Sequence, residues 1–268
     1  MLLPALSLGM NRQSTIDYLL SINQKNIYIR CMVNLSVNIN KIALIRNSRG
    51  SNYPDLIQVA KDCERFGADG ITVHPRPDER HVKFSDLQPL KDIVTTEFNI
   101  EGYPSDFFVQ QVLAVKPHQC TLVPDATDQL TSDHGWDTVT YFDFLKDIVA
   151  TLKQNNIRTS LFIDPDKKLI ENAAKLGADR IEYYTGPFAK DYAKDRAAAI
   201  KPVLDTLEIA DKSGLEINAG HDLNLENLTY FRQQIPTLKE VSIGHAIVCD
   251  AIYLGLENTI RMYKRCLL

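Results

Sequence analysis

The segment Phe66-Gly67-Ala68-Asp69-Gly70-Ile71-Thr72-Val73-His74 combines a helix end, a turn and an apolar strand in one short run. A glycine just past a helix adopts the left-handed conformation at little cost, and the apolar residues behind it are typical of a buried strand. The pattern recurs 110 residues further on as Leu176-Gly177-Ala178-Asp179-Arg180-Ile181. The two units predict alternating helices and strands, although Gly-Ala-Asp is also simply a common helix-to-strand turn.

The same alternation covers the chain from residue 33 onward. Apolar runs typical of strands lie at 33–39, 70–74, 98–101, 119–123, 157–163, 180–184, 215–218 and 240–243. Helical patterns lie at 54–66, 85–95, 105–115, 138–155, 167–176, 188–213 (as one helix or two), 225–233 and 246–266. We expect Pro54 in the first turn of its helix and Ser85 as an N-cap. Strands separated by helices pair in parallel, so eight such units predict an α/β fold, a closed (β/α)₈ TIM barrel, over the alternative of an open doubly wound sheet.

The composition is that of an ordinary globular protein. The chain has 268 residues, 44% hydrophobic and 24% charged, which excludes wholesale disorder. A net charge of −4 and a pI near 5.9 argue against a general nucleic-acid binder. The sequence has no apolar run of the roughly 18 residues that a membrane-spanning helix needs. Five scattered cysteines without a CxxC pair argue against disulfides or a zinc site and favour a cytoplasmic protein.

Residues 1–31 are predicted to be an N-terminal extension to a single catalytic domain over 32–268. The segment opens with the apolar Met1-Leu2-Leu3-Pro4-Ala5-Leu6, but its basic Arg12 follows this stretch, the reverse of the order in a secretory signal peptide. Met32 stands just before the first strong strand. We therefore expect the natural chain to begin there, or the extension to be a lineage-specific, flexible tail.

Polar residues gather where the predicted strands end, which in a TIM barrel is the rim that carries the chemistry. His74, His81, His221 and His245 fall on this rim, and Glu101 ends the third strand. A buried carboxylate there can act as a general base, whereas the alternative role is a salt bridge to a rim arginine. The other rim candidates are Asn38, Asn40, Lys41, Arg76, Thr131, Asp164 and Glu182. His118 and His134 are expected to be structural.

Glu182 alternates with apolar neighbours, so it is predicted to point into the barrel, with Lys41 or an arginine as its partner. Gly220-His221-Asp222 and Gly244-His245-Ala246 each follow a strand and open a helix, a pattern that favours a bound phosphate. Arg46, Arg49 and Arg76 are expected to add positive charge. Together these features favour acid–base chemistry on one or two phosphorylated substrates, with a histidine–carboxylate metal site as the competing interpretation.

Several longer segments resemble one family of enzymes. They are 36–43 with 46–50, 67–74 with Arg76, Asp78, Arg80 and His81, and then 116–118, 122–124, 160–164, 182 with 185–186, 218–221 and 243–247. Together they are similar to the pyridoxine 5′-phosphate synthases, the ring-closing enzymes of bacterial vitamin B6 synthesis. The resemblance covers the chain from Met32 to its end, and the first 31 residues match nothing in the family.

The resemblance implies a transferase-class synthase that condenses 1-deoxy-D-xylulose 5-phosphate with 3-amino-2-oxopropyl phosphate to pyridoxine 5′-phosphate, phosphate and water. It also implies a TIM barrel with extra helices, no metal or organic cofactor, and a homo-octamer as the only macromolecular association. Carried over by position, His74 and Glu101 match proton acceptors, His221 a proton donor, and Glu182 a residue that stabilises the transition state. The implied substrate contacts are Asn38, Asn40, Lys41, Arg49, Arg76, His81, Thr131, Asp222, Gly244 and His245.

Two departures from the family pattern weaken this correspondence. Many members carry Asp-His where this chain has Asn40-Lys41, and lysine cannot replace histidine in acid–base catalysis near neutral pH. The family often has glycine where this chain has Asp222, whose negative charge is unfavourable beside a phosphate unless the side chain points away.

Two other functions remain open from the sequence. A Schiff-base aldolase needs a lysine at a strand end, and Lys41 is the candidate nearest to one. A binding or scaffold protein that kept the barrel and lost catalysis is the second alternative, against which the presence of His74, Glu101 and His221 argues.

Overall fold

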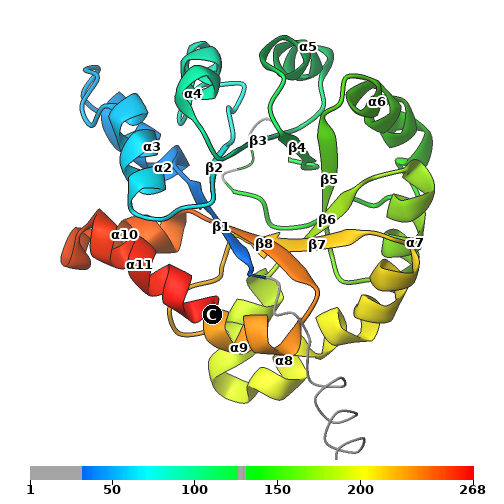
Figure 1. Cartoon of the computed structure of the whole chain (residues 1–268). Coiled ribbons are helices and arrows are strands. Elements are labelled where there is room, and N and C mark those ends of the chain that lie inside the picture. The colour runs from blue at the N-terminus through cyan, green and yellow to red at the C-terminus, as the bar shows by residue number, and fades with distance from the viewer. Residues whose placement is uncertain (1–31, 126–128, 130) are drawn as a thin grey trace, which may run out of the picture. The chain divides into compact units, whose positions relative to one another are not determined.

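The computed structural model describes residues 32–125, 129 and 131–268, and the predicted extension over 1–31 lies outside the described residues. One compact unit spans Met32–Leu268. Eight parallel strands close into a barrel in chain order, with β8 pairing back onto β1, and helices surround it (Figure 1). The predicted TIM barrel is confirmed, and the open sheet is excluded because the two end strands are hydrogen-bonded to each other.

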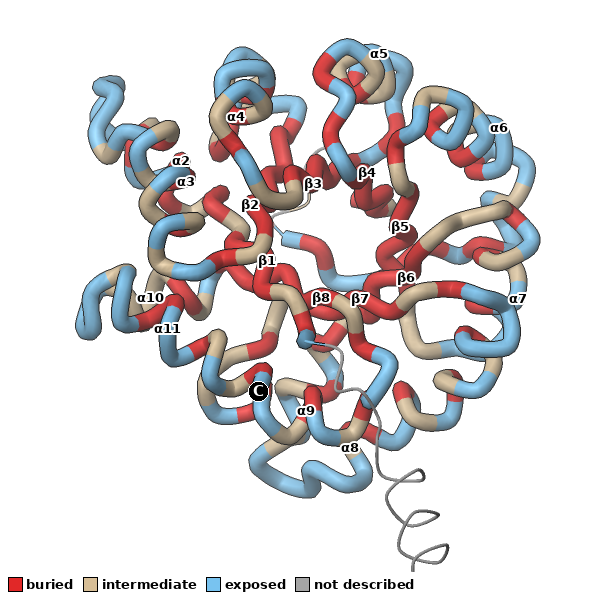
Figure 2. The backbone as a smooth tube through the Cα atoms, viewed as in Figure 1, coloured by how far each residue is buried: buried red, intermediate tan, exposed pale blue. Residues whose placement is uncertain are grey.

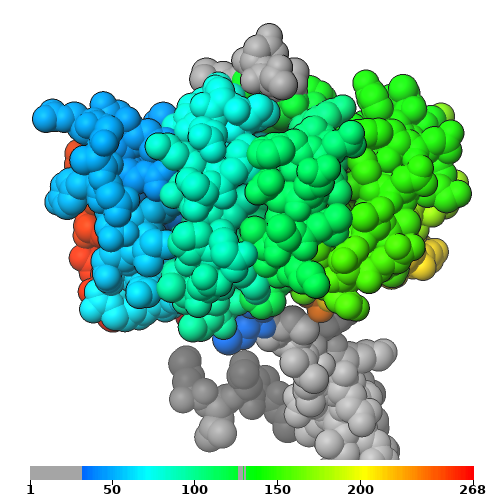
Figure 3. Space-filling view, turned by 90° about the horizontal axis from the view of Figure 1, so that it is seen from above, coloured from blue at the N-terminus to red at the C-terminus, as the bar shows by residue number. Residues whose placement is uncertain are grey.

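The strands are β1 Asn34–Asn38, β2 Gly70–Val73, β3 Glu97–Gly102, β4 Gln119–Leu122, β5 Arg158–Ile163, β6 Arg180–Tyr183, β7 Glu216–Gly220 and β8 Leu238–Ile243. The helices are α2 Asn40–Asn47, α3 Leu56–Arg65, the 3₁₀ turn η1 Phe84–Asp86, α4 Leu87–Ile93, α5 Asp106–Val115, α6 Phe142–Gln154, α7 Lys167–Leu176, α8 Gly186–Lys212, α9 Leu228–Gln234, α10 His245–Leu254 and α11 Leu256–Cys266. On the face seen in Figure 3, successive parts of the chain lie side by side in order, as the colours from blue through cyan to green show.

The apolar core lies between the strands and the helices. Strand residues are almost entirely buried, while the outward faces of the helices are exposed (Figure 2). Gly67 and Gly177 adopt positive φ values of 110° and 84° just past α3 and α7, as the repeated Gly-Ala-Asp turn predicts. In both turns the aspartate carboxylate accepts a backbone N–H of the preceding strand, from Leu35 to Asp69 and from Thr159 to Asp179. Each copy of the repeat therefore links the turn after a helix to the preceding strand of the barrel.

Several sequence-based helix boundaries are wrong. Residues 40–47 form helix α2, for which no prediction was made, and the final helix is two helices, α10 and α11. Asp55 caps α3 by accepting the N–H groups of Ile57 and Gln58, so Pro54 precedes the helix instead of lying in its first turn. Ser85 lies inside η1 and caps nothing. Helix α8 is kinked at Asp195, which agrees with the prediction that residues 188–213 could form two pieces.

A charged cluster fills the end of the barrel where the strands begin. Arg180 Nη1 lies 2.9 Å from Gln119 Oε1, 3.4 Å from Glu97 and 3.5 Å from Glu240, while its Nε donates to Glu216 at 2.8 Å. The side chain of Arg180 is only 8% exposed. Because carboxylates from several strands converge on one guanidinium, the cluster holds this end of the barrel together.

The opposite rim is held by Asp164, which follows β5. Its carboxylate accepts the N–H of Gly135 at 3.0 Å, and the N–H of Trp136 donates to the carbonyl of Phe162 at 2.8 Å. Trp136 is buried among Tyr103, Tyr141 and Phe144. The segment that follows Thr131 is therefore anchored to the barrel close to the rim.

Candidate active site

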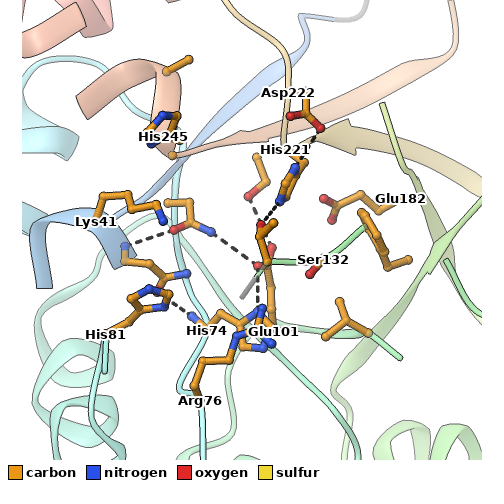
Figure 4. A pocket seen from close by; sticks show the side chains of 18 of the residues that line it. Lys41, His74, Arg76, His81, Glu101, Ser132, Glu182, His221, Asp222 and His245 are labelled. Carbon is orange, nitrogen blue, oxygen red and sulfur yellow. Dashed lines mark hydrogen bonds and ion pairs between the residues drawn. The ribbon is translucent and has the colours of Figure 1, made fainter. Parts of the chain in front are cut away.

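A cavity of about 500 Å³ opens at the rim where the strands end. Nineteen residues line it: Asn38, Asn40, Lys41, His74, Arg76, His81, Glu101, Val123, Thr131, Ser132, Phe162, Glu182, His221, Asp222, Asn224, Ser242, Gly244, His245 and Ala246. Their side chains converge from all sides of the barrel (Figure 4). The sequence-predicted site residues all lie here except Arg46, Arg49 and Asp164.

Glu101 extends from β3 into the bottom of this cavity. Its contacts are long: Asn38 Nδ2 at 3.4 Å, Ser242 Oγ at 3.5 Å and His74 Nδ1 at 3.9 Å. These long contacts replace little of the hydration that the carboxylate loses on burial. Burial therefore raises the pKa of Glu101 to about 7, although the charges of His221 and Arg76 oppose the shift. A carboxyl group with this pKa can take up and release a proton near neutral pH.

His74 faces Glu101 from the end of β2. The backbone N–H of His74 donates to Asn40 Oδ1 at 2.9 Å, which fixes the start of the loop. Burial, together with the positive charges of Arg76 and His81, lowers the pKa of His74 well below its ordinary value. The imidazole is consequently neutral at pH 7 and available as a proton acceptor.

The raised pKa of Glu101 makes folding stability pH-dependent. Folding favours the protonated carboxyl, so the stabilisation is complete below the unfolded pKa of about 4.5 and is lost as the pH rises through about 7. We expect Glu101→Gln to leave the melting temperature unchanged at pH 4.5 and to raise it at pH 8.5. The gain should be of the order of 3 kcal/mol, from 1.36 kcal/mol per pKa unit. Calorimetry at both pH values measures this, and equal shifts at the two values would contradict it.

His221 lies across the cavity at the end of β7. Its Nδ1 is 2.8 Å from Asp222 Oδ2, and its Nε2 is 2.8 Å from Thr131 Oγ1. Burial lowers the pKa of His221, but the hydrogen bond to Asp222 and the charges of Asp222, Glu101 and Asp125 outweigh it, so the net pKa is raised. The site thus combines a neutral imidazole and a protonatable one.

Glu182 points into the barrel from β6, as predicted. The prediction that Lys41 or an arginine pairs with its carboxylate is wrong. Among the described residues its Oε2 is buried without a hydrogen-bond partner. Burial and the nearby carboxylates of Glu101 and Glu240 raise its pKa well above the ordinary value. The protonated carboxylic acid is therefore favoured over the carboxylate, and in that form the group can donate a hydrogen bond into the cavity.

Positive groups gather on the side of the cavity formed by the loop after β2. Arg76 Nη2 pairs with Asp125 Oδ2 at 2.7 Å, and Ser132 Oγ donates to the same oxygen at 2.6 Å. Arg76 Nε is a buried donor without a hydrogen-bond partner among the described residues. His81 Nδ1 is also buried and unpartnered there, on a ring whose pKa burial lowers to about 4. Buried donors of this kind need an acceptor, so this side suits an anionic ligand.

A second anion-binding position is the start of α10. Gly244 is the N-cap residue, and Gly244, His245 and Ala246 line the cavity. A Cβ atom at Gly244 would lie 2.9 Å from the carbonyl oxygen of Asn38, so only glycine fits without a shift. The N–H groups at the start of this helix, with its dipole, attract an anion such as phosphate. His245 Nε2 also contacts Cys249 Sγ at 3.5 Å.

Two predicted arginine contacts do not lie where they were expected. Arg49 is exposed just beyond α2 and does not line the cavity. Arg46 points away from the site because its guanidinium makes a bidentate pair with Asp86, at 2.8 Å for both nitrogens. Sequence position alone could not show that the turn of α2 directs these side chains outward. His118, expected to be structural, accepts the N–H of Phe98 at 3.0 Å.

Sequence reasoning missed Asp125, Ser132 and Ser242. Asp125 is buried and positions Arg76, Ser132 lines the cavity beside Thr131, and Ser242 contacts Glu101. Ser242 is the next-to-last residue of β8, directly before Ile243-Gly244, so its strand position was a usable signal. Among the described residues no group of three or more His, Cys, Asp or Glu side chains is arranged as a metal site.

Fold and site together define a TIM-barrel enzyme whose cavity joins acid–base groups to two positions suited to anions. The family described as pyridoxal phosphate biosynthesis protein PdxJ matches residues 35–268, and the chain belongs to this family. The chain is therefore an enzyme of vitamin B6 biosynthesis.

Curated relatives agree with this assignment, and a solved structure of low identity shares the fold. The pyridoxine 5′-phosphate synthase of Parabacteroides distasonis is 58% identical over 236 residues, 88% of this chain and 99% of that protein. The synthase of Cytophaga hutchinsonii is 57% identical over 87% of this chain and 98% of that protein. A phosphoribosylanthranilate isomerase from Thermotoga maritima has a TM-score of 0.55 at 11% identity, covering 88% of this chain and 98% of that one, so it shares the fold alone.

Proposed function

We propose that the cavity makes pyridoxine 5′-phosphate from 1-deoxy-D-xylulose 5-phosphate and 3-amino-2-oxopropyl phosphate, with phosphate and water as the other products. The observation that carries the proposal is the opposition of His74 and Glu101 to His221 across one cavity. Their surroundings shift the proton affinities differently, because the pKa of His74 is lowered whereas the pKa values of Glu101 and His221 are raised. Such a pair of environments is what a reaction with several proton transfers requires.

The two anion-binding positions support one substrate each. The deoxyxylulose phosphate would lie against Arg76, His81 and Thr131, where buried donors lack acceptors. The aminoketone phosphate would lie at the start of α10, against Gly244, His245 and Asn38. Their reacting carbons would then meet over Glu101, between the two phosphate groups.

Acid–base steps follow from this placement. His74 and Glu101 would accept protons as the amine adds to a carbonyl and as carbon acids are deprotonated. His221 would donate protons to the oxygens that leave as water. Glu182, neutral and buried, would donate a hydrogen bond to the oxygen on which negative charge develops. The chemistry proposed here uses protein side chains, with no metal or organic cofactor.

The test is product formation by the full chain supplied with both phosphorylated substrates. We expect phosphate release and a pyridoxine-like absorbance that depend on both substrates together. The aldolase alternative predicts instead that borohydride traps a substrate adduct on Lys41. Trapping on Lys41, with no ring product, would replace the proposed function by the aldolase.

We also propose that the chain acts in the cytoplasm as a homo-octamer, without nucleic-acid or membrane partners. Ile252 and Tyr253 at the end of α10 are 72% and 89% exposed, an apolar surface that association would cover. In the described part of the chain, no helix has both the length and the apolar character needed to cross a membrane. Light scattering of the native chain measures the assembly, and a monomeric mass would contradict it.

A further inference from the structure

We propose that Asp222 is a positioning residue that fixes the ring orientation and tautomer of His221, rather than a substrate contact. The proposal rests on the proposed function, because it concerns the proton donor of the same site. In the structure Asp222 Oδ2 lies 2.8 Å from His221 Nδ1 (Figure 4). On the other side of the ring, Thr131 Oγ1 lies 2.8 Å from His221 Nε2. A carboxylate, an imidazole and a hydroxyl therefore form a line that ends in the cavity.

The backbone holds this arrangement in place. His221 has a φ of 51°, a conformation that non-glycine residues rarely adopt, and its N–H donates to the carbonyl of Ser242 at 3.2 Å. The N–H of Asp222 donates to Thr185 Oγ1 at 3.3 Å, and Asn227 Nδ2 donates to the carbonyl of Asp222 at 3.3 Å. Contacts from α8's N-cap and from the start of α9 thus fix the turn that aims Asp222 at the ring.

The hydrogen bond determines which ring nitrogen reacts. A carboxylate only accepts, so Nδ1 of His221 must carry a proton in both charge states of the ring. In the neutral ring Nε2 then has a lone pair and accepts from the Thr131 hydroxyl. In the charged ring Nε2 carries the proton that faces the cavity. Asp222 therefore makes Nε2 the atom that exchanges protons with a substrate.

Other charged groups also face His221, and they must be separated from the effect of Asp222. Glu101 lies on β3, Asp125 follows β4 and His74 follows β2, while the rings of Phe162 and Tyr184 flank the imidazole at 6.5 and 6.1 Å. Burial lowers the pKa of His221, and the hydrogen bond and charge of Asp222 are the strongest opposing effects, ahead of Glu101 and Asp125. Losing Asp222 should therefore lower the pKa of His221 although the other carboxylates remain.

This geometry also answers the concern raised by the negative charge of Asp222 beside a phosphate. The carboxylate is directed at the imidazole, where the opposite charge partly neutralises it. A chain with glycine at this position keeps the backbone N–H but lacks the Nδ1 acceptor. The effect belongs to chains that, like this one, carry aspartate after the strand-seven histidine.

The direct test is the titration of His221 in the substrate-free full chain, with ¹³Cε1-labelled histidine followed by NMR and assigned by comparison with His221→Gln. The variants are Asp222→Asn, which removes the charge, and Asp222→Gly, which removes the side chain. Asp133→Asn is the matched control, since Asp133 is a rim aspartate that pairs with His134. We expect both Asp222 variants to lower the His221 titration midpoint by about one pH unit or more, as expected for loss of a charge-assisted hydrogen bond.

Kinetics give the second measurement. The alkaline limb of the kcat/KM profile should move to lower pH by the same amount as the titration midpoint, and kcat at pH 8 should fall about tenfold, while both KM values change less than about twofold. A midpoint within about 0.3 unit of the parent value in both Asp222 variants would overturn the proposal. So would a tenfold rise in one KM at unchanged kcat, which would make Asp222 a substrate contact. If the chain lacks synthase activity, the proposed function fails, and the NMR titration still decides the role of Asp222.

Discussion

Replacing Glu101 by glutamine is expected to lower kcat about 10³-fold, within the 10²–10⁴-fold that a positioned general acid–base group contributes. Glutamine has the same shape and can keep contacts with Asn38 and Ser242, but it cannot carry the proton. In the proposed arrangement Glu101 would touch the reacting groups rather than the phosphates, so KM for both substrates should stay within about threefold. Steady-state kinetics with each substrate varied in turn measure this split.

Glu240→Gln is the matched control. Glu240 is also fully buried and also has a raised pKa, about 8, from burial and the charge of Glu97. It lies in the charged cluster at the other end of the barrel and does not line the cavity. Its replacement should leave kcat within about threefold of the parent value. Comparable losses in the two variants would show that carboxylate burial in general, rather than proton transfer by Glu101, controls the rate.

Replacing Arg180 by methionine should destabilise the barrel by about 3–5 kcal/mol at pH 7, the cost of leaving buried charges without their partner. Glu97 and Glu216 would lose their shared cation, whereas Glu240, whose pKa is about 8, is mostly protonated at pH 7. Arg180 holds the pKa of Glu216 below its ordinary value against the opposing effect of burial, so this stabilisation exists above the unfolded pKa and is lost as the pH falls. The loss should therefore be smaller at pH 4 than at pH 7, which denaturant unfolding at both pH values measures.

Arg65→Met provides the comparison for this experiment. Arg65 pairs with Asp62 on the surface of α3, where its side chain is 69% exposed. An exposed pair contributes at most about 1 kcal/mol. If Arg180→Met lowers the free energy of unfolding no more than Arg65→Met does, the charged cluster does not stabilise this end of the barrel.

The barrel could be predicted from the sequence because its signals are local. Each strand is a short apolar run followed by a helix, and Gly67 and Gly177 mark two helix ends by a conformation that other residues avoid. Helix α2 was missed because it begins at Asn40, only two residues after the end of β1, and its N-cap residue is Ile39, which gives no side-chain capping signal. The charged cluster was missed for a different reason. Glu97 and Arg180 are 83 positions apart, and only closure of the barrel brings them together.

The site was predictable where strand ends determine position. His74, Glu101, Glu182 and His221 lie at the ends of four strands, so the closed barrel directs all of them into one cavity. Positions set by helix turns were not predictable in this way. Arg49 lies outside the cavity just past α2, and the Asp222 side chain turns toward His221 because of a loop conformation that the sequence does not reveal. The residue pattern had placed both near a bound phosphate, and the resemblance had implied that both contact a substrate.

The most direct measurement of the central claim is ³¹P NMR of one reaction containing the full chain and both phosphorylated substrates. If one cavity binds both and moves the protons between them, each pyridoxine 5′-phosphate formed is accompanied by one inorganic phosphate. The Glu101→Gln enzyme should retain both substrate complexes and form neither product at a comparable rate. Phosphate release without the ring product, or release that proceeds with one substrate omitted, would contradict the account.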